Sequence, residues 1–276
     1  MREINIAGGG LVGLALGICL RKADVPCQIY EAYSYPRHRV CGEFISGIDA
    51  RDLESLGVSP EALGAKVLST TAWFSANRKL RSDELPTSAL GLSRWRMDKA
   101  LADSFTARGG KLTINHRYKL NNKEGLIDCT GRTLDRSSKW IGLKCHLKGF
   151  KPEADLEMHF SDGGYVGISK IEGDDQFNLC GLFKLKPKTR KHQKPLISSY
   201  LVHCRLQRLA IRVDESEFVE GSESAVSGLA YGADATKAFP ALGDAAGLIP
   251  PFTGNGMSLA IESAFIAMPT LLHYSM

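Results

Sequence analysis

The chain has 276 residues, of which 43% are apolar, 24% charged and 8% aromatic. A chain of this length and composition can bury a large core, which excludes a disordered or fibrous protein. Lys and Arg number 35 and Asp and Glu 30, so the net charge is only +5 and nucleic acid is not an expected partner.

The most apolar stretch, Leu11 to Leu20, is too short to span a bilayer, and no cleavable signal peptide is evident. The seven cysteines are widely spaced, odd in number and without a Cys-x-x-Cys pair. We therefore expect reduced thiols, a cytoplasmic location, no stable membrane insertion and no metal site. The sequence leaves the oligomeric state open.

The N-terminal segments predict the opening of a doubly wound α/β fold. A short apolar strand over Glu3–Ala7 runs into three glycines, a helix is predicted over Leu11–Lys22, and a second strand over Val25–Tyr30. An irregular polar stretch follows, and then helices are predicted around Asp49–Leu56 and from Ser59 onward.

Strands are predicted at Leu68–Phe74 and near Leu80, followed by a helix at Arg96–Arg108, and the segments Leu112–Ile114 and Gly125–Cys129 are predicted to return to a sheet. An antiparallel sheet is predicted for the block that follows, because strand patterns alternate with turn signals there. Its strands are Trp140–Leu147, Leu156–Phe160, Tyr165–Ile171 and Phe177–Leu185. A basic run, Lys184–Lys194, is expected to be a solvated connection to a helix over Pro195–Leu209, and the last helix is expected after Asn255.

Gly8, Gly10 and Gly13 form Gly-x-Gly-x-x-Gly directly after a strand and at the start of a helix. Such glycines allow a tight turn, close approach of the backbone to a diphosphate, and close packing of helix on strand. Glu31 ends the next strand, about 20 residues on, where an acid accepts hydrogen bonds from an adenosine ribose. The pattern predicts an ADP-containing cofactor, and a glycine-tolerant packing turn is the weaker alternative.

A second glycine-rich segment runs from Gly243 to Gly247 and then from Pro250 to Met257, where the last helix opens. A short acid such as Asp244 can accept from a polyol hydroxyl, and a helix N-terminus offers N–H donors to an anionic ring edge. Flavins have both features, whereas a nicotinamide dinucleotide has no ribityl chain. A Gly/Pro turn before a helix explains this segment alone equally well, but becomes improbable beside the first motif.

With these residues the chain resembles the FAD-dependent monooxygenases of the p-hydroxybenzoate hydroxylase type and, more closely, the geranylgeranyl-reductase-like branch of that superfamily. The resemblance runs through almost the whole chain. It rests on Gly8–Gly13 with Glu31, on Arg39–Glu43, on Leu92–Arg94 with Asp98 and Leu101, on Asp128–Arg132, and on Gly243–Asp244 with the Pro-x-x-Gly-x-Gly that follows.

The resemblance implies an α/β fold with a glutathione-reductase-type, Rossmann-like FAD-binding domain and an inserted antiparallel β-sheet substrate domain. Residues 1–66, 91–138 and 225–276 would form the discontinuous FAD-binding domain, and residues 67–90 and 139–224 the substrate-side sheet. FAD is the implied cofactor, and NAD(P)H would bind only transiently as reductant. The further C-terminal helices usual in relatives are expected to be absent, since the chain ends at Met276.

The same resemblance implies the cofactor contacts. The adenosine diphosphate half is implied to contact Gly8, Gly10, Gly13 and Glu31. The diphosphate or the flavin is implied to lie near Arg39 and Arg94, with a surface charge as the alternative for Arg39 and a helix-start partner for Asp98 as the alternative for Arg94. Cys41 and the turn at Gly131 would lie beside the cofactor, and Asp244 would accept from the ribityl chain. The pyrimidine side of the ring is implied to face the loop that holds Pro251, Gly254, Asn255, Gly256 and Met257.

The function implied by the resemblance is that of an FAD-dependent oxidoreductase, with monooxygenation of an aromatic or polyketide-like small molecule favoured. A geranylgeranyl-reductase-like flavoenzyme that saturates isoprenoid double bonds and a catalytically degenerate flavin-binding protein are the alternatives. The Trp-x-Trp-x-Ile-Pro signature of flavin halogenases is missing, which argues against halogenation. No catalytic side chain is assigned, and Trp140, His146, His159 and Tyr165 are expected mainly to pack on the second sheet.

Overall fold

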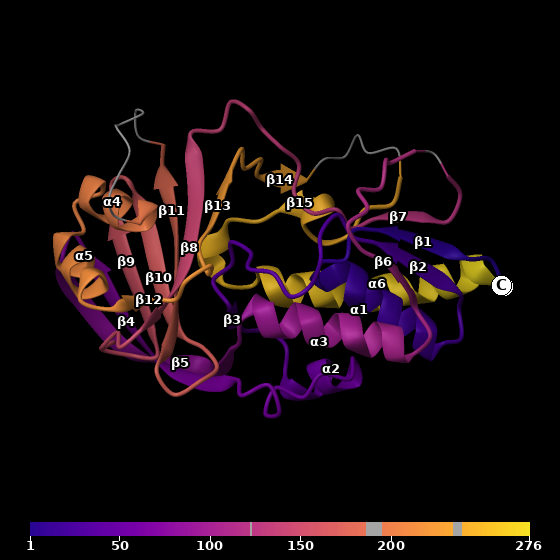
Figure 1. Cartoon of the computed structure of the whole chain (residues 1–276), viewed down its shortest axis with the longest axis horizontal. Helices are drawn as coiled ribbons and strands as arrows, with labels where there is room; N and C mark the ends of the chain where they lie inside the picture. The colour runs from indigo at the N-terminus through magenta and orange to yellow at the C-terminus, as the bar shows by residue number, and fades with distance from the viewer. Residues whose placement is uncertain (122, 186–194, 234–238) are drawn as a thin grey trace.

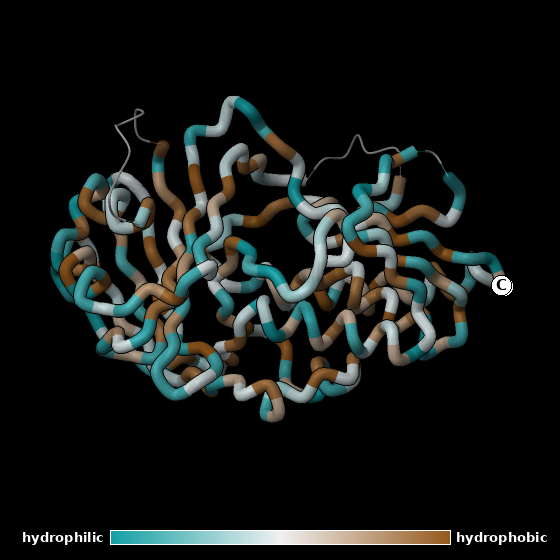
Figure 2. Tube along the Cα trace, viewed as in Figure 1, coloured by the Kyte–Doolittle hydropathy of each residue, from teal (hydrophilic) through white to brown (hydrophobic). Residues whose placement is uncertain are grey.

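The computed structural model describes residues 1–121, 123–185, 195–233 and 239–276, so most of the basic run Lys184–Lys194 lies outside the described residues. Two large sheets occupy opposite ends of the molecule, with helices packed between and beneath them (Figure 1). Figure 2 shows hydrophobic segments along the strands and inner helices, and hydrophilic segments mainly on the outer loops. The predicted α/β class is confirmed.

The smaller sheet is parallel, with the strand order β6-β2-β1-β7. Its strands are β1 (Ile4–Ala7), β2 (Cys27–Tyr30), β6 (Lys111–Thr113) and β7 (Leu126–Asp128). All four residues of β1 are buried, as expected for a parallel strand covered on both faces. Ala241 forms a parallel bridge with Asp128, so the late segment of the chain returns beside β7.

Three helices carry the core of this half: α1 (Leu11–Lys22), α3 (Arg94–Ala107) and α6 (Gly256–Ser275). Helix α1 packs against both of the others, and Leu14, Ile18 and Ile261 share one apolar core with Ile6 of β1. The first and last helices of the chain are therefore held side by side. The short helix α2 (Ala50–Ser55) begins at Asp49, whose side chain accepts from the Asp52 N–H at 3.1 Å.

The larger sheet has the order β12-β8-β11-β10-β9-β4-β5-β3, and β13 also pairs with β8. The strands are β3 (Phe44–Ile45), β4 (Lys66–Ser75), β5 (Arg78–Gly91), β8 (Trp140–Lys148), β9 (Leu156–Ser161), β10 (Gly164–Lys170), β11 (Gln176–Lys184), β12 (Glu217–Phe218) and β13 (Ser224–Ser227). The strands of the block Trp140–Leu185 pair antiparallel, as predicted, but the larger sheet as a whole is mixed, because β4 and β9 run parallel. Long connections through the other sheet separate these two strands in sequence, so no hairpin fixes their direction.

The two faces of the larger sheet differ because alternate residues of a strand point to opposite sides. One face is apolar, with Cys145, Ile168 and Leu179, and it is covered by α4 (Leu196–His203) and α5 (Gln207–Asp214) (Figure 1). The other face is polar. In the cross-strand register it carries Lys144, His146, Ser169, Asn178 and Cys180.

Two helix predictions are wrong. The helix expected over Pro195–Leu209 is broken into α4 and α5, because Arg205 between them adopts a left-handed φ of +59°. No helix forms from Ser59. Its hydroxyl accepts from the Ala62 N–H at 3.2 Å within a series of turns that ends at Gly64. Among the described residues, no helix combines the length and apolar character needed to cross a bilayer.

Candidate functional site

The first glycine motif forms the turn between β1 and α1, at the carboxyl edge of the parallel sheet. Gly8 has a φ of +107°, and a side chain there would collide with the Cys129 carbonyl. A side chain at Gly13 would collide with the Gly8 carbonyl, so both glycines are required by packing. At Gly10, in contrast, φ is −81° and a Cβ would meet no heavy atom of the described residues within 4 Å. The space in front of Gly10 is therefore open to a ligand.

Glu31 directly follows β2 and lies against this turn. One carboxylate oxygen accepts from the Gly9 N–H at 2.8 Å and the other from the Tyr33 N–H at 3.1 Å, and the residue is only 5% exposed. The Tyr35 hydroxyl donates to the Gly9 carbonyl on the same turn. A carboxylate offers about four acceptor positions, so Glu31 can hold the turn and still accept from a ribose hydroxyl.

Two helix N-termini face this edge without a side-chain cap. Helix α1 follows Gly10 and α6 follows Asn255, and within the described chain neither preceding residue caps its helix through a side chain. The first turns contain no acidic residue, so their N–H groups keep a positive potential suited to an anion. A Cβ at Gly256, the first residue of α6, would also have no atom within 4 Å in the part of the chain that the structure describes.

Asp244 lies between these two helices, in the short 3-10 helix Gly243–Ala245. It lines a pocket of about 250 Å³ together with strands β14 (Gly232–Ala233) and β15 (Gly247–Leu248). The residue is exposed, but partial desolvation in the pocket wall raises the pKa of Asp244, while the charges of Arg94 and Arg132 oppose that shift. The carboxylate is therefore within electrostatic reach of both arginines.

Arg39 and Arg94 meet at the buried carboxylate of Asp98. Arg94 makes contacts of 2.6 and 2.9 Å with Asp98, and Arg39 makes one of 3.0 Å and lies 3.6 Å from Glu31. Burial disfavours the charge of Arg94, but Asp98 outweighs it and raises the pKa of the guanidinium. The helix-start pairing weighed for Arg94 is thus present, and Arg39 is a link between Asp98 and Glu31 instead of a surface charge.

Arg37 was not singled out from the sequence. Its Nη1 atom is buried and has no hydrogen-bond partner among the described residues, and its guanidinium lies 3.7 Å from the centroid of the Tyr33 ring. Burial and the neighbouring charge of Arg39 lower the pKa of Arg37. Neither Arg37 nor the nearby Arg132 forms an ion pair with a described residue. A buried guanidinium donor without a partner fits an anionic group such as a diphosphate.

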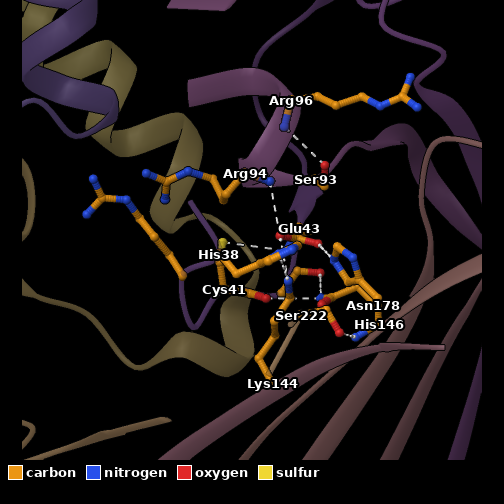
Figure 3. Close-up of polar contacts among 12 residues, drawn as sticks. His38, Cys41, Glu43, Ser93, Arg94, Arg96, Lys144, His146, Asn178 and Ser222 are labelled. Carbon is orange, nitrogen blue, oxygen red and sulfur yellow. Dashed lines mark hydrogen bonds and ion pairs between the residues drawn. The ribbon is translucent and has the colours of Figure 1, made fainter. Parts of the chain in front are cut away.

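The segment from Cys41 to Glu43 crosses the polar face of the larger sheet (Figure 3). Asn178 Nδ2 donates to the carbonyls of Cys41 at 3.0 Å and Gly42 at 2.7 Å, and the Ser169 hydroxyl donates to Gly42 at 3.0 Å. The Cys41 thiol accepts from the Glu43 N–H at 3.5 Å, and burial raises the pKa of that thiol. A protonated thiol here is a packing and hydrogen-bonding group, not a nucleophile.

Glu43 is the centre of a buried polar cluster (Figure 3). Its carboxylate accepts from His146 Nε2 at 2.6 Å and from the Arg94 backbone N–H at 3.0 Å, and it lies 3.3 Å from Lys144 Nζ. Lys144 Nζ also lies 3.0 Å from His38 Nδ1. Burial disfavours the carboxylate, but the bond to His146 and the charge of Lys144 outweigh it and hold the pKa of Glu43 below its ordinary value. His146 thus has a polar role that the sequence did not reveal.

In the glycine-rich loop from Pro250 to Met257, some residues are exposed at the surface and others are buried in the core. Pro251, Asn255 and Gly256 are exposed, and Gly254 ends the 3-10 helix Pro251–Thr253 with a left-handed φ of +74°. Met257 is 5% exposed and packs in the core of the parallel-sheet half, so only its backbone is available at the helix start. Gly131 also has a positive φ, +89°, and no atom of residues 1–121, 123–185, 195–233 or 239–276 would lie within 4 Å of a Cβ there.

The distant segments meet at one edge of the parallel sheet. Gly8 approaches Cys129 and Thr130, and a Cβ at Gly243 would lie 3.1 Å from Val12 in the first turn of α1. The Leu242 N–H donates to the Asp128 carbonyl at 3.0 Å. The two glycine motifs, the turn after β7 and the arginines near Asp244 therefore surround one region of the molecule.

No protein-family model matches the chain, and no curated protein matches its sequence. Among solved structures, 509 chains match. The flavin-dependent brominase Bmp2 has a TM-score of 0.75 at 17% identity, over 99% of this chain and 79% of its own. P. aeruginosa PqsL in complex with 2-aminobenzoylacetate has a TM-score of 0.71 at 16% identity, over 98% and 86%. A mutant of the halogenase PltM in complex with FAD has a TM-score of 0.74 at 14% identity, over 99% and 70%. At these identities the likeness establishes the fold.

Proposed function

We propose that the chain binds FAD at the carboxyl edge of the parallel sheet and acts as an FAD-dependent oxidoreductase. The observation that carries this proposal is the meeting of the two glycine motifs, because Gly243 packs on Val12 in the first turn of the helix that Gly10 begins. At Gly10 and Gly256, no packing contact within the described chain explains why the residue is a glycine and why the space beside it is open. The fold shared with the brominase Bmp2 and with PltM in its FAD complex supports the same proposal.

The proposed cofactor contacts use groups that the fold leaves available. The N-terminus of α1 at Gly10 takes the diphosphate together with Arg37, and Glu31 accepts from the ribose. Asp244 accepts from the ribityl chain, and the uncapped N-terminus of α6 at Gly256 faces the pyrimidine edge of the ring. Bound FAD supplies the redox chemistry, while these residues bind and orient it.

Within this class we favour a monooxygenase that uses NAD(P)H and acts on an aromatic or polyketide-like molecule. A row of aromatic side chains supports this choice. Trp73 stacks on Phe160 with centroids 5.7 Å apart, and Tyr165 lies 6.2 Å from Phe160 and 6.2 Å from Phe252 of the late glycine loop. Rings in this arrangement suit a planar apolar substrate between the larger sheet and the cofactor. PqsL in its complex with 2-aminobenzoylacetate shares the fold.

The reaction is tested with purified protein, FAD, NADH or NADPH and a panel of aromatic compounds under isotopically labelled oxygen. Labelled hydroxylated product together with NAD(P)H-dependent oxygen uptake supports the monooxygenase. Anaerobic loss of an isoprenoid double bond supports the geranylgeranyl-reductase-like alternative instead. A yellow protein that does neither supports the degenerate flavin-binding protein. A brominated product in the presence of bromide would overturn the inference drawn from the missing halogenase signature.

A further inference from the structure

The outer side of β5 is an open edge at the margin of the larger sheet (Figure 1). One side of β5 pairs with β4, and on the other side, within the described chain, it pairs with the two-residue strand β3 at Leu90 and Gly91. Every residue from 78 to 84 is exposed. Alternate residues of an antiparallel strand direct their N–H and C=O groups away from the paired neighbour. Residues 78–84, here called the exposed edge, therefore present backbone donors and acceptors to solvent.

The start of the exposed edge is held in place by the fold. Ser75 of β4 pairs directly with Arg78, so a two-residue turn joins the two strands. Within that turn, Asn77 Nδ2 donates to the Arg205 carbonyl at 2.8 Å, and Asn77 Oδ1 accepts from the Arg208 N–H at 3.1 Å. The turn is thus fixed to the start of α5, and a partner strand would meet an edge that is already extended.

A bulge interrupts the exposed edge near its middle. Between Lys79 and Arg81 the pairing with β4 shifts by one residue, so Leu80 has no partner in that strand. Leu80 is 51% exposed. Bulges and charged side chains are the means by which natural sheets keep their edges from pairing with unrelated strands. A strand that pairs with the exposed edge must therefore match its charges.

The charges of the exposed edge follow a definite order. In chain order they are three bases and then two acids: Arg78, Lys79, Arg81, Asp83 and Glu84. Arg81 and Asp83 pair with each other at 2.8 Å in the middle of the strand. Arg78 and Glu84, at its two ends, form no ion pair with a described residue. One end of the exposed edge thus keeps an unpaired cation and the other end an unpaired anion.

This order of charges is complementary to itself when the direction of the strand is reversed. In an antiparallel pair of two such edges, the basic half of each lies opposite the acidic half of the other, whereas a parallel pair would place like charges side by side. Two antiparallel copies of one strand are related by a two-fold axis, so each contact is made twice and association ends at the dimer. The chemistry of the edge therefore favours a second copy of this chain over other partners.

We propose that the protein forms a homodimer in which the exposed edge pairs antiparallel with the exposed edge of a second copy. The two nine-stranded sheets then continue into each other. Arg78 of each copy faces the acidic half of the other, and Leu80 is removed from water near the two-fold axis. This inference does not depend on FAD, because none of the proposed cofactor contacts lies on β5.

The test is sedimentation velocity of the purified protein, with and without FAD, over a series of concentrations. A single strand pair is a small interface, so a Kd of about 10 µM is expected for the dimer and the series extends to about 200 µM. Hydrogen exchange provides a local readout. The amides of residues 78–84 are expected to exchange more slowly in the dimer than in the monomer.

Charge reversal tests the direction of pairing. The basic variant, Asp83→Lys/Glu84→Lys, and the acidic variant, Arg78→Glu/Lys79→Glu, are each expected to raise the Kd of the homodimer about tenfold or more, because like charges then face each other. An equimolar mixture of the two variants is expected to form a heterodimer, since opposite charges meet again.

The control for the basic variant is Asp103→Lys/Glu124→Lys. It makes the same change in net charge at exposed residues of the parallel-sheet half and is expected to dimerise like the wild type. The melting temperature of each variant shows that it is folded. If a double variant fails to fold, Arg78→Glu and Glu84→Lys alone decide, because neither side chain forms an ion pair with the described part of the chain.

Three outcomes would overturn the inference. The first is a wild-type protein that stays monomeric throughout the concentration series. The second is a dimer that persists unchanged in both edge variants, because it would then use another surface. The third is a mixture of the basic and acidic variants that stays monomeric, because the order of charges would then not direct the pairing. None of these results bears on the proposed function, which FAD titration tests separately.

Discussion

A Cβ on Gly243 would lie 3.1 Å from Cγ1 of Val12, so the late glycine segment touches the first turn of the first helix. This contact follows from the side-by-side packing of α1 and α6, whose apolar residues share one core. Because the helices are held together, their uncapped N-termini stay at a fixed separation. One extended ligand with an anionic centre and an anionic ring edge can therefore contact both.

The glycines of the first motif divide into two kinds with different consequences. Gly8→Ala is expected to lower the free energy of unfolding by about 2 kcal/mol, because it combines a positive φ with a collision at the Cys129 carbonyl. Gly10→Ala is expected to lower the free energy of unfolding by only about 0.5 kcal/mol, because alanine is a weaker N-cap than glycine, and yet to raise the Kd for FAD about tenfold. Chemical denaturation and FAD titration measure the two effects. Equal losses of stability in both variants would contradict this division.

Asp244 is expected to contribute a charge-assisted hydrogen bond to the cofactor. Asp244→Ala should raise the Kd for FAD by about tenfold or more, and Asp244→Asn by less, since the amide oxygen still accepts. Isothermal titration of the apoprotein measures the change. Asp103→Ala is the control, because Asp103 is exposed on α3 and, among the described residues, forms its ion pair with Lys99 at 2.6 Å. Unchanged affinity in Asp244→Ala would remove this residue from the site.

Arg37 and Arg117 form a matched pair, since both guanidinium groups lie over the Tyr33 ring, at 3.7 and 5.8 Å from its centroid. Only Arg37 has a buried Nη1 without a partner among the described residues. Arg37→Met is expected to weaken FAD about tenfold and to reduce the salt dependence of binding, because one cation facing the diphosphate is lost. Arg117→Met should leave both quantities unchanged. If the two variants behave alike, Arg37 does not face the anion.

We expect the stability of the fold to depend on pH in the acid range because of Glu157. It is buried, accepts from His159 at 2.8 Å and lies 2.8 Å from Arg212. Burial opposes ionisation, but His159 and Arg212 outweigh it and lower the pKa of Glu157 to about 2. A carboxylate with a depressed folded-state pKa stabilises the fold above its unfolded pKa, and this stabilisation, at most about 3 kcal/mol, is lost as pH falls from about 4.5 to about 2.

Glu157→Gln is therefore expected to lower the free energy of unfolding at pH 7 and to flatten its dependence on pH in that acid range. Urea denaturation at a series of pH values measures both. Glu153→Gln is the control, because Glu153 pairs with Lys79 at the surface. A variant that keeps the full wild-type slope below pH 4.5 would show that other carboxylates carry the dependence.

Local patterns predicted much of the parallel-sheet half. Helix α1 has the predicted bounds, Leu11–Lys22, because an unbroken apolar run begins at a glycine turn and ends in Arg21 and Lys22. The break between α4 and α5 was missed, since Arg205 adopts its left-handed conformation without a Gly or Asn to signal it. The parallel pairing of β4 with β9 depends on strands far apart in the chain, and no turn between them indicates it.

In the candidate site, too, the sequence could not predict the roles of several side chains. Glu43, Lys144 and His146 give no local signal, because the contacts that define their roles join residues about a hundred positions apart. Arg39 matched a family motif, but it is paired with the carboxylate of Asp98. Arg37, two residues earlier, keeps a buried donor that has no partner in the described part of the chain. Sequence spacing predicts which segment approaches the proposed cofactor site, whereas the register of the fold decides which side chain is available.

The most direct test of the central claim is a titration of the wild-type apoprotein with FAD, followed by flavin fluorescence and by the melting temperature. We expect saturable binding of one FAD per chain, a perturbed visible spectrum and a melting temperature that rises with FAD concentration. A colourless protein whose fluorescence signal stays linear in added FAD, and whose melting temperature does not move, would contradict the account.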